Sequence, residues 1–224
     1  MTRNTLPQDH GAAPAKSNLE LIEQWITGSA QILDGLSGEK SVRTAIPGAM
    51  FFLGIQYQHS IAVLCRNGLY AGAFALLRPL TEALFRGAWL LFSATDQQLN
   101  DFADRGKFPN RDEVDRDLEK VKPRYKKIRE HLDQTYGRTL HDFSHGGHQQ
   151  MWSRIRGTSI CEGHYEENVE SLLHAVAVLG YLCSIEITNA CKSVPHAQRL
   201  QSLFRSYFPP GRELDHLADP GEGE

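Results

Sequence analysis

The side chains best suited to chemistry lie in one histidine-rich stretch, residues 138–156, with the sequence RTLHDFSHGGHQQMWSRIR. Six residues separate Arg138 from His145 in this stretch. An imidazole gains and loses its proton near neutral pH, and a planar guanidinium matches the oxygens of a phosphate. Residues of these two types can therefore take part in acid–base chemistry and in anion binding.

Three further polar side chains surround this pair. His141 lies four residues before His145, so the two share one face of a helix. Ser144 directly precedes His145, and His148 follows two glycines that can end the helical turn and let backbone N–H groups approach a ligand. We therefore include His141, Ser144 and His148 as supporting residues of the candidate site.

A second group of polar residues interrupts an apolar segment, Tyr70–Phe92. Arg78, Glu82 and Arg86 are spaced four apart, so they form one stripe on an otherwise apolar helix. A helix that is apolar on most sides is normally buried, and buried charges must be paired. We therefore expect this charged stripe to lie inside the protein, where the two arginines would keep Glu82 ionised.

Pro79 lies inside the same helix and removes one backbone hydrogen bond. The carbonyl of Ala75 loses its partner, and the long central helix should bend at this point. The bend is an accommodation of packing or the shaping of a pocket beside the charged stripe.

A third feature is a charged segment that begins at Arg111 and contains a cluster of cations. Mixed charges at helical spacing are typical of a solvated face. The alternative is a phosphate-binding patch. Its residues would be Lys120, Lys122, Arg124, Lys126, Lys127 and Arg129.

The rest of the chain predicts the elements that must position these residues. Capping boxes begin helices at Ser17, with Glu20, and at Thr95, with Gln98. No segment has the period-two alternation of a strand. We predict an all-α, single-domain bundle of about seven helices over residues 17–208, with a long kinked central helix and disordered ends at 1–16 and 209–224. The expected helices cover residues 17–36, 45–66 (with Pro47 in the first turn), 70–92, 95–105, 111–137 with a break at Pro123, 165–190 and 196–208.

Composition limits the function classes. The formal net charge of −3 over 224 residues argues against non-specific coating of nucleic acid, although a local basic groove is compatible with it. Four cysteines without a CxxC pair, and an N-terminus without an apolar core, indicate reduced thiols in a cytoplasmic protein. Charged or polar residues interrupt the apolar runs Tyr70–Phe92 and Leu172–Cys191, so we interpret both as core helices and expect no membrane association.

Three interpretations of the site remain open. In the first, the protein is a non-catalytic scaffold or regulator. Arg138 or His145 then hydrogen-bonds the carboxylate of Glu82 and forms a structural polar core, which is the commoner role of a histidine in a packed helical protein.

In the second, the site cleaves RNA without a metal. The spacing of Arg138 and His145 resembles the R-x(4–6)-H motif of the HEPN superfamily, all-helical domains that include endoribonucleases of toxin–antitoxin and phage-defence systems. The resemblance implies that His145 is the general base on a ribose 2′-hydroxyl, that Arg138 stabilises the phosphorane, and that the product carries a 2′,3′-cyclic phosphate. Thr139 departs from the family's usual polar Asn, Asp or His.

A larger region, from about Tyr57 to His148, resembles a family of uncharacterised bacterial helical proteins regarded as remotely HEPN-like. The shared elements are R-x-L-x-E, here Arg78 to Glu82, and S-H-G-G, here Ser144 to Gly147. This resemblance implies a protein of bacterial defence or stress type, with RNA and a cognate antitoxin or other protein as partners, and a homodimer with its cleft between the two copies. It implies no cofactor and no metal.

In the third, the segment LHDFSHGGH resembles the His-Asp pair of HD-domain metal phosphohydrolases. Such enzymes also need a distant upstream histidine and a downstream aspartate. His131 is only ten residues before His141, and the aspartates after Asp142 are Asp215 and Asp219 in the expected tail. The ligand set is therefore poorly supplied.

Overall fold

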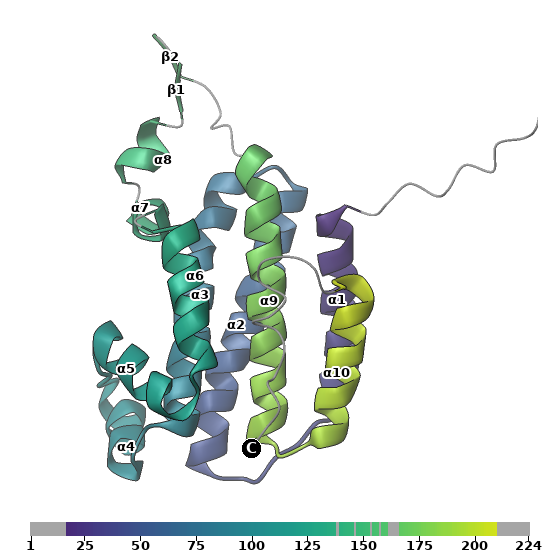
Figure 1. The fold of residues 1–224 in the computed structure, drawn as a ribbon, viewed down its shortest axis with the longest axis vertical. Coiled ribbons are helices and arrows are strands. Elements are labelled where there is room, and N and C mark those ends of the chain that lie inside the picture. Colours follow the sequence, from purple (N-terminus) through teal and green to yellow (C-terminus); the bar gives the residue numbers. More distant parts are fainter. Residues whose placement is uncertain are drawn as a thin grey trace, which may run out of the picture.

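The computed structural model describes residues 17–137, 139–145, 147–152, 154–156, 158–160 and 166–209, with backbone only at 139–141, 149, 156, 166 and 167. The expected disordered ends lie outside these residues, except for Pro209. The described part is all-α, which confirms the predicted class (Figure 1). Its helices are α1 (Asn18–Leu33), α2 (Val42–Arg66), α3 (Tyr70–Phe92), α4 (Asp96–Arg105), α5 (Arg111–Val121), α6 (Arg124–Thr135), α7 (Thr139–His145), α8 (His148–Trp152), α9 (Glu166–Ala190) and α10 (Val194–Tyr207).

The described residues thus form ten helices rather than about seven, because the charged segment divides at Pro123 and the histidine-rich stretch forms two short helices. One hairpin was not predicted: β1 (Ile155–Arg156) pairs antiparallel with β2 (Ser159–Ile160). Strands of two residues are too short to produce a period-two signal. Pro47 lies in the second turn of α2 rather than the first, because that helix begins at Val42.

Local signals set several helix ends as predicted. The capping boxes at Ser17 and Thr95 are both formed, and Asn110 with Glu113 forms a third at the start of α5. α3 has the predicted bounds and continues through Pro79. Because an internal proline cannot donate to the preceding turn, the carbonyl of Ala75 is left for another partner.

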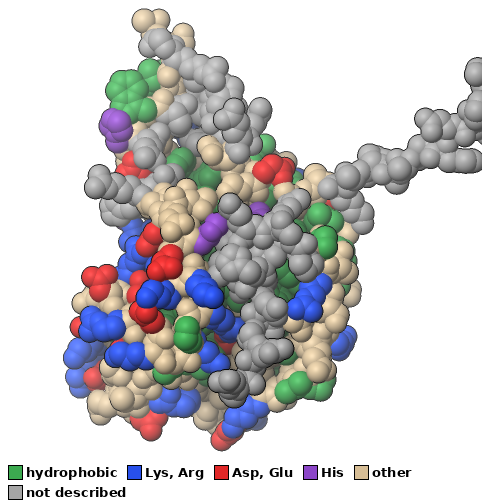
Figure 2. Space-filling model, in the orientation of Figure 1, with side chains coloured by type: hydrophobic (Ala, Val, Ile, Leu, Met, Phe, Trp, Pro, Cys, Tyr) green, Lys and Arg blue, Asp and Glu red, His purple; other side chains and the backbone are tan. Residues whose placement is uncertain are grey.

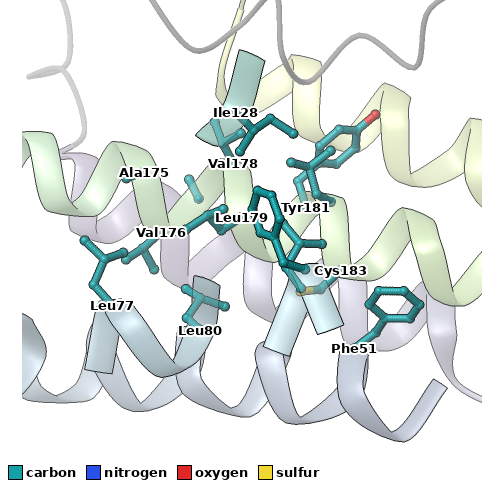
Figure 3. Close-up of a cluster of buried hydrophobic side chains, with 14 of the residues drawn as sticks. Phe51, Leu77, Leu80, Ile128, Ala175, Val176, Val178, Leu179, Tyr181 and Cys183 are labelled. Carbon is teal, nitrogen blue, oxygen red and sulfur yellow. The ribbon is translucent and has the colours of Figure 1, made fainter. Parts of the chain in front are cut away.

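Three long helices, α2, α3 and α9, build the core of the bundle (Figures 1 and 3). Leu77 and Leu80 of α3 face Val176 and Leu179 of α9 in this core. Gly180 lets α9 approach α2 closely, since a Cβ there would lie 2.0 Å from the side chain of Gln58. α9 is also long and apolar enough to cross a membrane, but 83% of its most apolar window is buried inside the protein, as the sequence predicts for a core helix.

A buried ionic cluster joins α6 to α9. Glu186 is fully buried in the apolar helix α9 and forms an ion pair with Arg124. The hydroxyl of Tyr125 and the side-chain amide of Asn189 donate to the same carboxylate, each at 2.8 Å. Burial, together with the negative charge of Glu186, raises the pKa of Tyr125 well above its ordinary value. The cluster fixes α6 against the core helix α9.

Candidate functional site

The charged stripe of α3 lies at the surface, which corrects the expectation that it is enclosed. Glu82 accepts from Nε of Arg78 at 2.9 Å and pairs with Nη2 of Arg86 at 3.1 Å. The three side chains are 34%, 39% and 45% exposed, in the order Arg78, Glu82, Arg86. α3 buries its apolar faces on α2 and α9 and leaves this stripe accessible, which spares the three charges full desolvation.

Helix α7 packs on α3 next to this stripe. The hydroxyl of Ser144 donates to the carbonyl of Ala75 at 3.4 Å, which is the carbonyl that Pro79 deprives of its helical partner. The rings of Phe143 and Phe74 lie 5.1 Å apart beside this contact. Helix α7 therefore packs on the turn of α3 that directly precedes Arg78.

Arg78 joins the stripe to the histidine segment. Its Nη1 lies 3.2 Å from Nε2 of His145. A guanidinium has donors only, so Nε2 accepts in this contact and the imidazole carries its proton on Nδ1. His145 is exposed, and the same arginine holds Glu82. The imidazole of His145 therefore contacts the guanidinium of Arg78 on the central helix. The scaffold interpretation expected a direct hydrogen bond to Glu82 instead.

His145 borders an open groove of about 360 Å³, which we call the histidine groove. One wall is α2, with Met50, Leu53 and Tyr57, and the other is the charged stripe. Ser144 and His145 of α7 also line it. The groove therefore combines an apolar side, an aromatic ring, two guanidinium groups and an imidazole in one solvent-accessible place.

A separate cavity of about 340 Å³, which we call the arginine cavity, lies on the other side of the charged stripe. The stripe is shared, because its three residues line both hollows. The cavity is completed by the start of α5 and by α6. Its further lining residues are Thr81, Phe85, Phe108, Pro109, Asn110, Arg111, Val114, Arg129 and Gly137.

The remaining predicted site residues do not all join this place. Arg138 lies outside the described residues, and of His141 only the backbone is described. His148 is exposed in α8, with its ring 5.8 Å from that of Trp152, and it does not line the groove. Of the histidine segment, the described side chains place Ser144 and His145 at the groove.

The six cations of the predicted phosphate-binding patch mostly have carboxylate partners. Lys120 pairs with Asp117, and Lys126 with Glu119. Figure 2 shows positive and negative side chains intermixed over α5 and α6. Four cations have acidic partners, and Lys122 lies over the Phe92 ring, so the charge of this segment is largely compensated. The other two paired cations are Arg124, with Glu186, and Arg129, with Asp115.

No three His, Cys, Asp or Glu side chains come together as metal ligands within the described ranges. The sequence signals missed the α2 wall of the histidine groove, because Met50, Leu53 and Tyr57 have the spacing of ordinary core positions. They also missed Arg111, which the sequence assigned to a solvated face. Only packing in three dimensions places these residues beside α3.

The fold and site define an all-helical, single-domain protein with an arginine–glutamate–histidine cluster on its central helix. By comparison with known families, the chain belongs to the family described as "Family of unknown function (DUF6988)", which matches residues 51–210. The match includes α3, α7 and every lining residue of the histidine groove except Met50. Searches of curated proteins and of solved structures found no match.

Proposed function

We propose that this protein binds an unpaired RNA strand in the histidine groove and cleaves it without a metal, with His145 as the general base. One observation carries the proposal: an exposed imidazole lies 3.2 Å from a guanidinium at the edge of an open groove. A proton acceptor beside a phosphate-binding cation is the minimum that 2′-hydroxyl transesterification needs.

Arg78 and Arg86 bind the scissile phosphate in this proposal. Both guanidinium groups line the groove, and each now has one contact with the carboxylate of Glu82. A phosphate can offer each of them two acceptor oxygens. When Arg78 turns toward the phosphate, Nε2 of His145 loses its donor and becomes free to accept a proton. Tyr57 on the opposite wall provides a ring on which an unpaired base can stack.

The reaction is a transfer within the RNA. Nε2 of His145 takes the proton of the ribose 2′-hydroxyl, and the 2′-oxygen attacks the adjacent phosphorus. The bond from phosphorus to the 5′-oxygen of the next nucleotide breaks, and that oxygen takes a proton from the imidazolium or from water. The products are a 2′,3′-cyclic phosphate and a 5′-hydroxyl, so no oxidant, metal or cofactor is consumed.

The remaining parts of the HEPN resemblance stay predictions. Arg138 is the phosphorane-stabilising residue that the resemblance implies, and its test is Arg138→Gln. A homodimer, a cognate antitoxin, a cytoplasmic location and a role in bacterial defence or stress belong to the same set. None of them is needed for the chemistry assigned to His145 and Arg78.

The test uses a single-stranded RNA oligonucleotide, the full chain and excess EDTA. Cleavage should persist in EDTA, fall at least about a hundredfold in His145→Ala, and disappear when the cleaved nucleotide is 2′-deoxy. His59→Ala is the matched control, because His59 is an exposed histidine on α2 outside the groove. Activity that EDTA abolishes, or that His145→Ala retains, overturns the proposal.

The scaffold interpretation remains the second candidate, because the contacts Ser144–Ala75 and Arg78–His145 both join α7 to α3. In that case His145→Ala should lower the free energy of unfolding while the wild-type protein cleaves no RNA. A variant that loses cleavage but keeps its unfolding midpoint favours the enzyme.

A further inference from the structure

The arginine cavity has a chemistry that RNA cleavage in the groove does not use. Four guanidinium groups line it, from Arg78, Arg86, Arg111 and Arg129. Apolar side chains fill the spaces between them, chiefly Phe108 and Val114 together with the edge of the buried Phe85. A concave volume of about 340 Å³ that is lined by both charged and apolar side chains can hold a small molecule with a charged part and an apolar part.

The polar groups of this cavity have a surplus of donors. Nη2 of Arg86 forms an ion pair with Glu82. Nε and Nη2 of Arg111 donate to Asp115 and Asp133, and Nε and Nη2 of Arg129 both donate to Asp115. The Nη1 groups of these three arginines have no acceptor within the described part of the chain. Within the described residues, these donors are left to a ligand or to water.

The charges around the cavity set the charge of that ligand. Three carboxylates form ion pairs with the four arginines: Glu82, which lines the cavity, and Asp115 and Asp133, which lie behind the lining. One positive charge is therefore in excess, which matches a single negative charge on the ligand. A carboxylate is planar and accepts two parallel N–H bonds from a guanidinium.

We propose that the arginine cavity binds a small organic carboxylate whose body is an apolar ring. The carboxylate accepts from the spare Nη1 donors, and the ring occupies the apolar part beside Phe108 and Val114. Arg129 is already fixed for this role, because it lies over the Phe85 ring with 3.7 Å to its centroid and bonds Asp115 twice. A site that is ordered before binding loses less entropy on binding.

The proposal does not rest on RNA cleavage, because the cavity and the histidine groove lie on opposite sides of the charged stripe. Arg111, the first residue of α5, lines the cavity and not the groove. Arg111→Gln and His145→Ala therefore separate the two sites.

The test is isothermal titration calorimetry on the full chain with three probes: trans-cinnamate, its uncharged amide cinnamamide, and phenyl phosphate. Cinnamate should bind one to one with a Kd below about 1 mM, and cinnamamide at least about tenfold more weakly. Phenyl phosphate, as a dianion, should bind more weakly than cinnamate. Cinnamate affinity should be the same in His145→Ala as in wild type.

Variants place the binding in the cavity. Arg111→Gln and Arg86→Gln should each weaken cinnamate binding at least about tenfold, with circular dichroism confirming that they fold. Arg105→Gln is the matched control, since Arg105 is exposed at the end of α4 and does not line the cavity. The proposal is overturned if wild type gives no saturable heat, if cinnamamide or phenyl phosphate binds as tightly as cinnamate, or if Arg105→Gln weakens binding as much as the cavity variants do.

Discussion

Ser144 donates a hydrogen bond to the carbonyl of Ala75. This carbonyl has no donor within its own helix, because Pro79 lacks an N–H. The contact joins two sequence elements that are separated by more than sixty positions. Together with the Arg78–His145 contact, it holds α7 on α3 and brings His145 to the groove. A proline inside α3 and a serine before His145 therefore act as one positioning unit.

A double-mutant cycle measures this relationship. Ser144→Ala should lower the free energy of unfolding by about 0.5–1.5 kcal/mol, because it leaves the Ala75 carbonyl without its partner. Pro79→Ala restores the N–H that can bond Ala75 within the helix. Ser144→Ala should therefore lower the free energy of unfolding by less in the Pro79→Ala variant than in the wild-type protein. Urea unfolding of the four proteins gives the coupling energy. An equal effect of Ser144→Ala in both backgrounds would contradict the pairing of Ser144 with the Ala75 carbonyl.

The buried ion pair should be expensive to break. Glu186→Gln removes the charge that faces Arg124 inside the protein, so we expect the free energy of unfolding to fall by about 3 kcal/mol or more. Glu119→Gln is the control, because its partner Lys126 is half exposed, and it should cost less than about 1 kcal/mol. Urea unfolding measures both. A similar loss of unfolding free energy in the two variants would contradict the claim that burial makes the Glu186–Arg124 pair costly to break.

The close approach of α9 to α2 makes Gly180 intolerant of a side chain. Gly180→Ala would place a Cβ against Gln58, whose amide donates to the carbonyl of Val176 at 3.0 Å. We expect a loss of about 1–3 kcal/mol in the free energy of unfolding, despite alanine's better helix propensity. Gly48→Ala, in the same type of structure but with nothing within 4 Å, should instead gain about 0.5–1 kcal/mol. Thermal unfolding compares the two, and a stabilised Gly180→Ala would exclude this packing.

The buried thiols should make the protein less stable at alkaline pH. Burial raises the pKa of Cys65 from 9.0 to about 11 and that of Cys183 further still. Above pH 9 the unfolded chain releases these protons while the native protein keeps them, so the free energy of unfolding falls as the pH rises. Between pH 8 and pH 10 each thiol should account for roughly 1 kcal/mol. Cys65→Ala should make this decline with pH shallower. Urea unfolding midpoints at pH 8, 9 and 10 measure the decline, and an equal slope in Cys65→Ala and wild type would contradict the prediction.

Much of the fold was predictable because its signals are local. The bounds of α3, the two capping boxes and the break at Pro123 each depend on a few adjacent residues. The carbonyl freed by Pro79 was predictable for the same reason. The hairpin of β1 and β2 was not, because two residues per strand carry no periodicity.

The site was predictable only in part, because its residues meet through packing. Spacing placed Arg78 and Glu82 correctly side by side on α3, but it suggested that the stripe was enclosed. His145 was expected to hydrogen-bond Glu82, and it contacts Arg78 instead. Enclosure depends on which helices cover α3, and no residue of α3 itself records that α5, α6 and α7 leave a hollow on each side of the stripe. The partners of Arg124 and Arg129 lie on other helices, so a run of cations in sequence became a set of ion pairs in space.

The most direct test of the central claim identifies the ends of RNA fragments produced by the full chain in excess EDTA. The account predicts fragments with 2′,3′-cyclic phosphate and 5′-hydroxyl ends, at a rate that falls about a hundredfold or more in His145→Ala and is unchanged in His59→Ala. Intact RNA after incubation with wild type, or equal rates for wild type and His145→Ala, would contradict it.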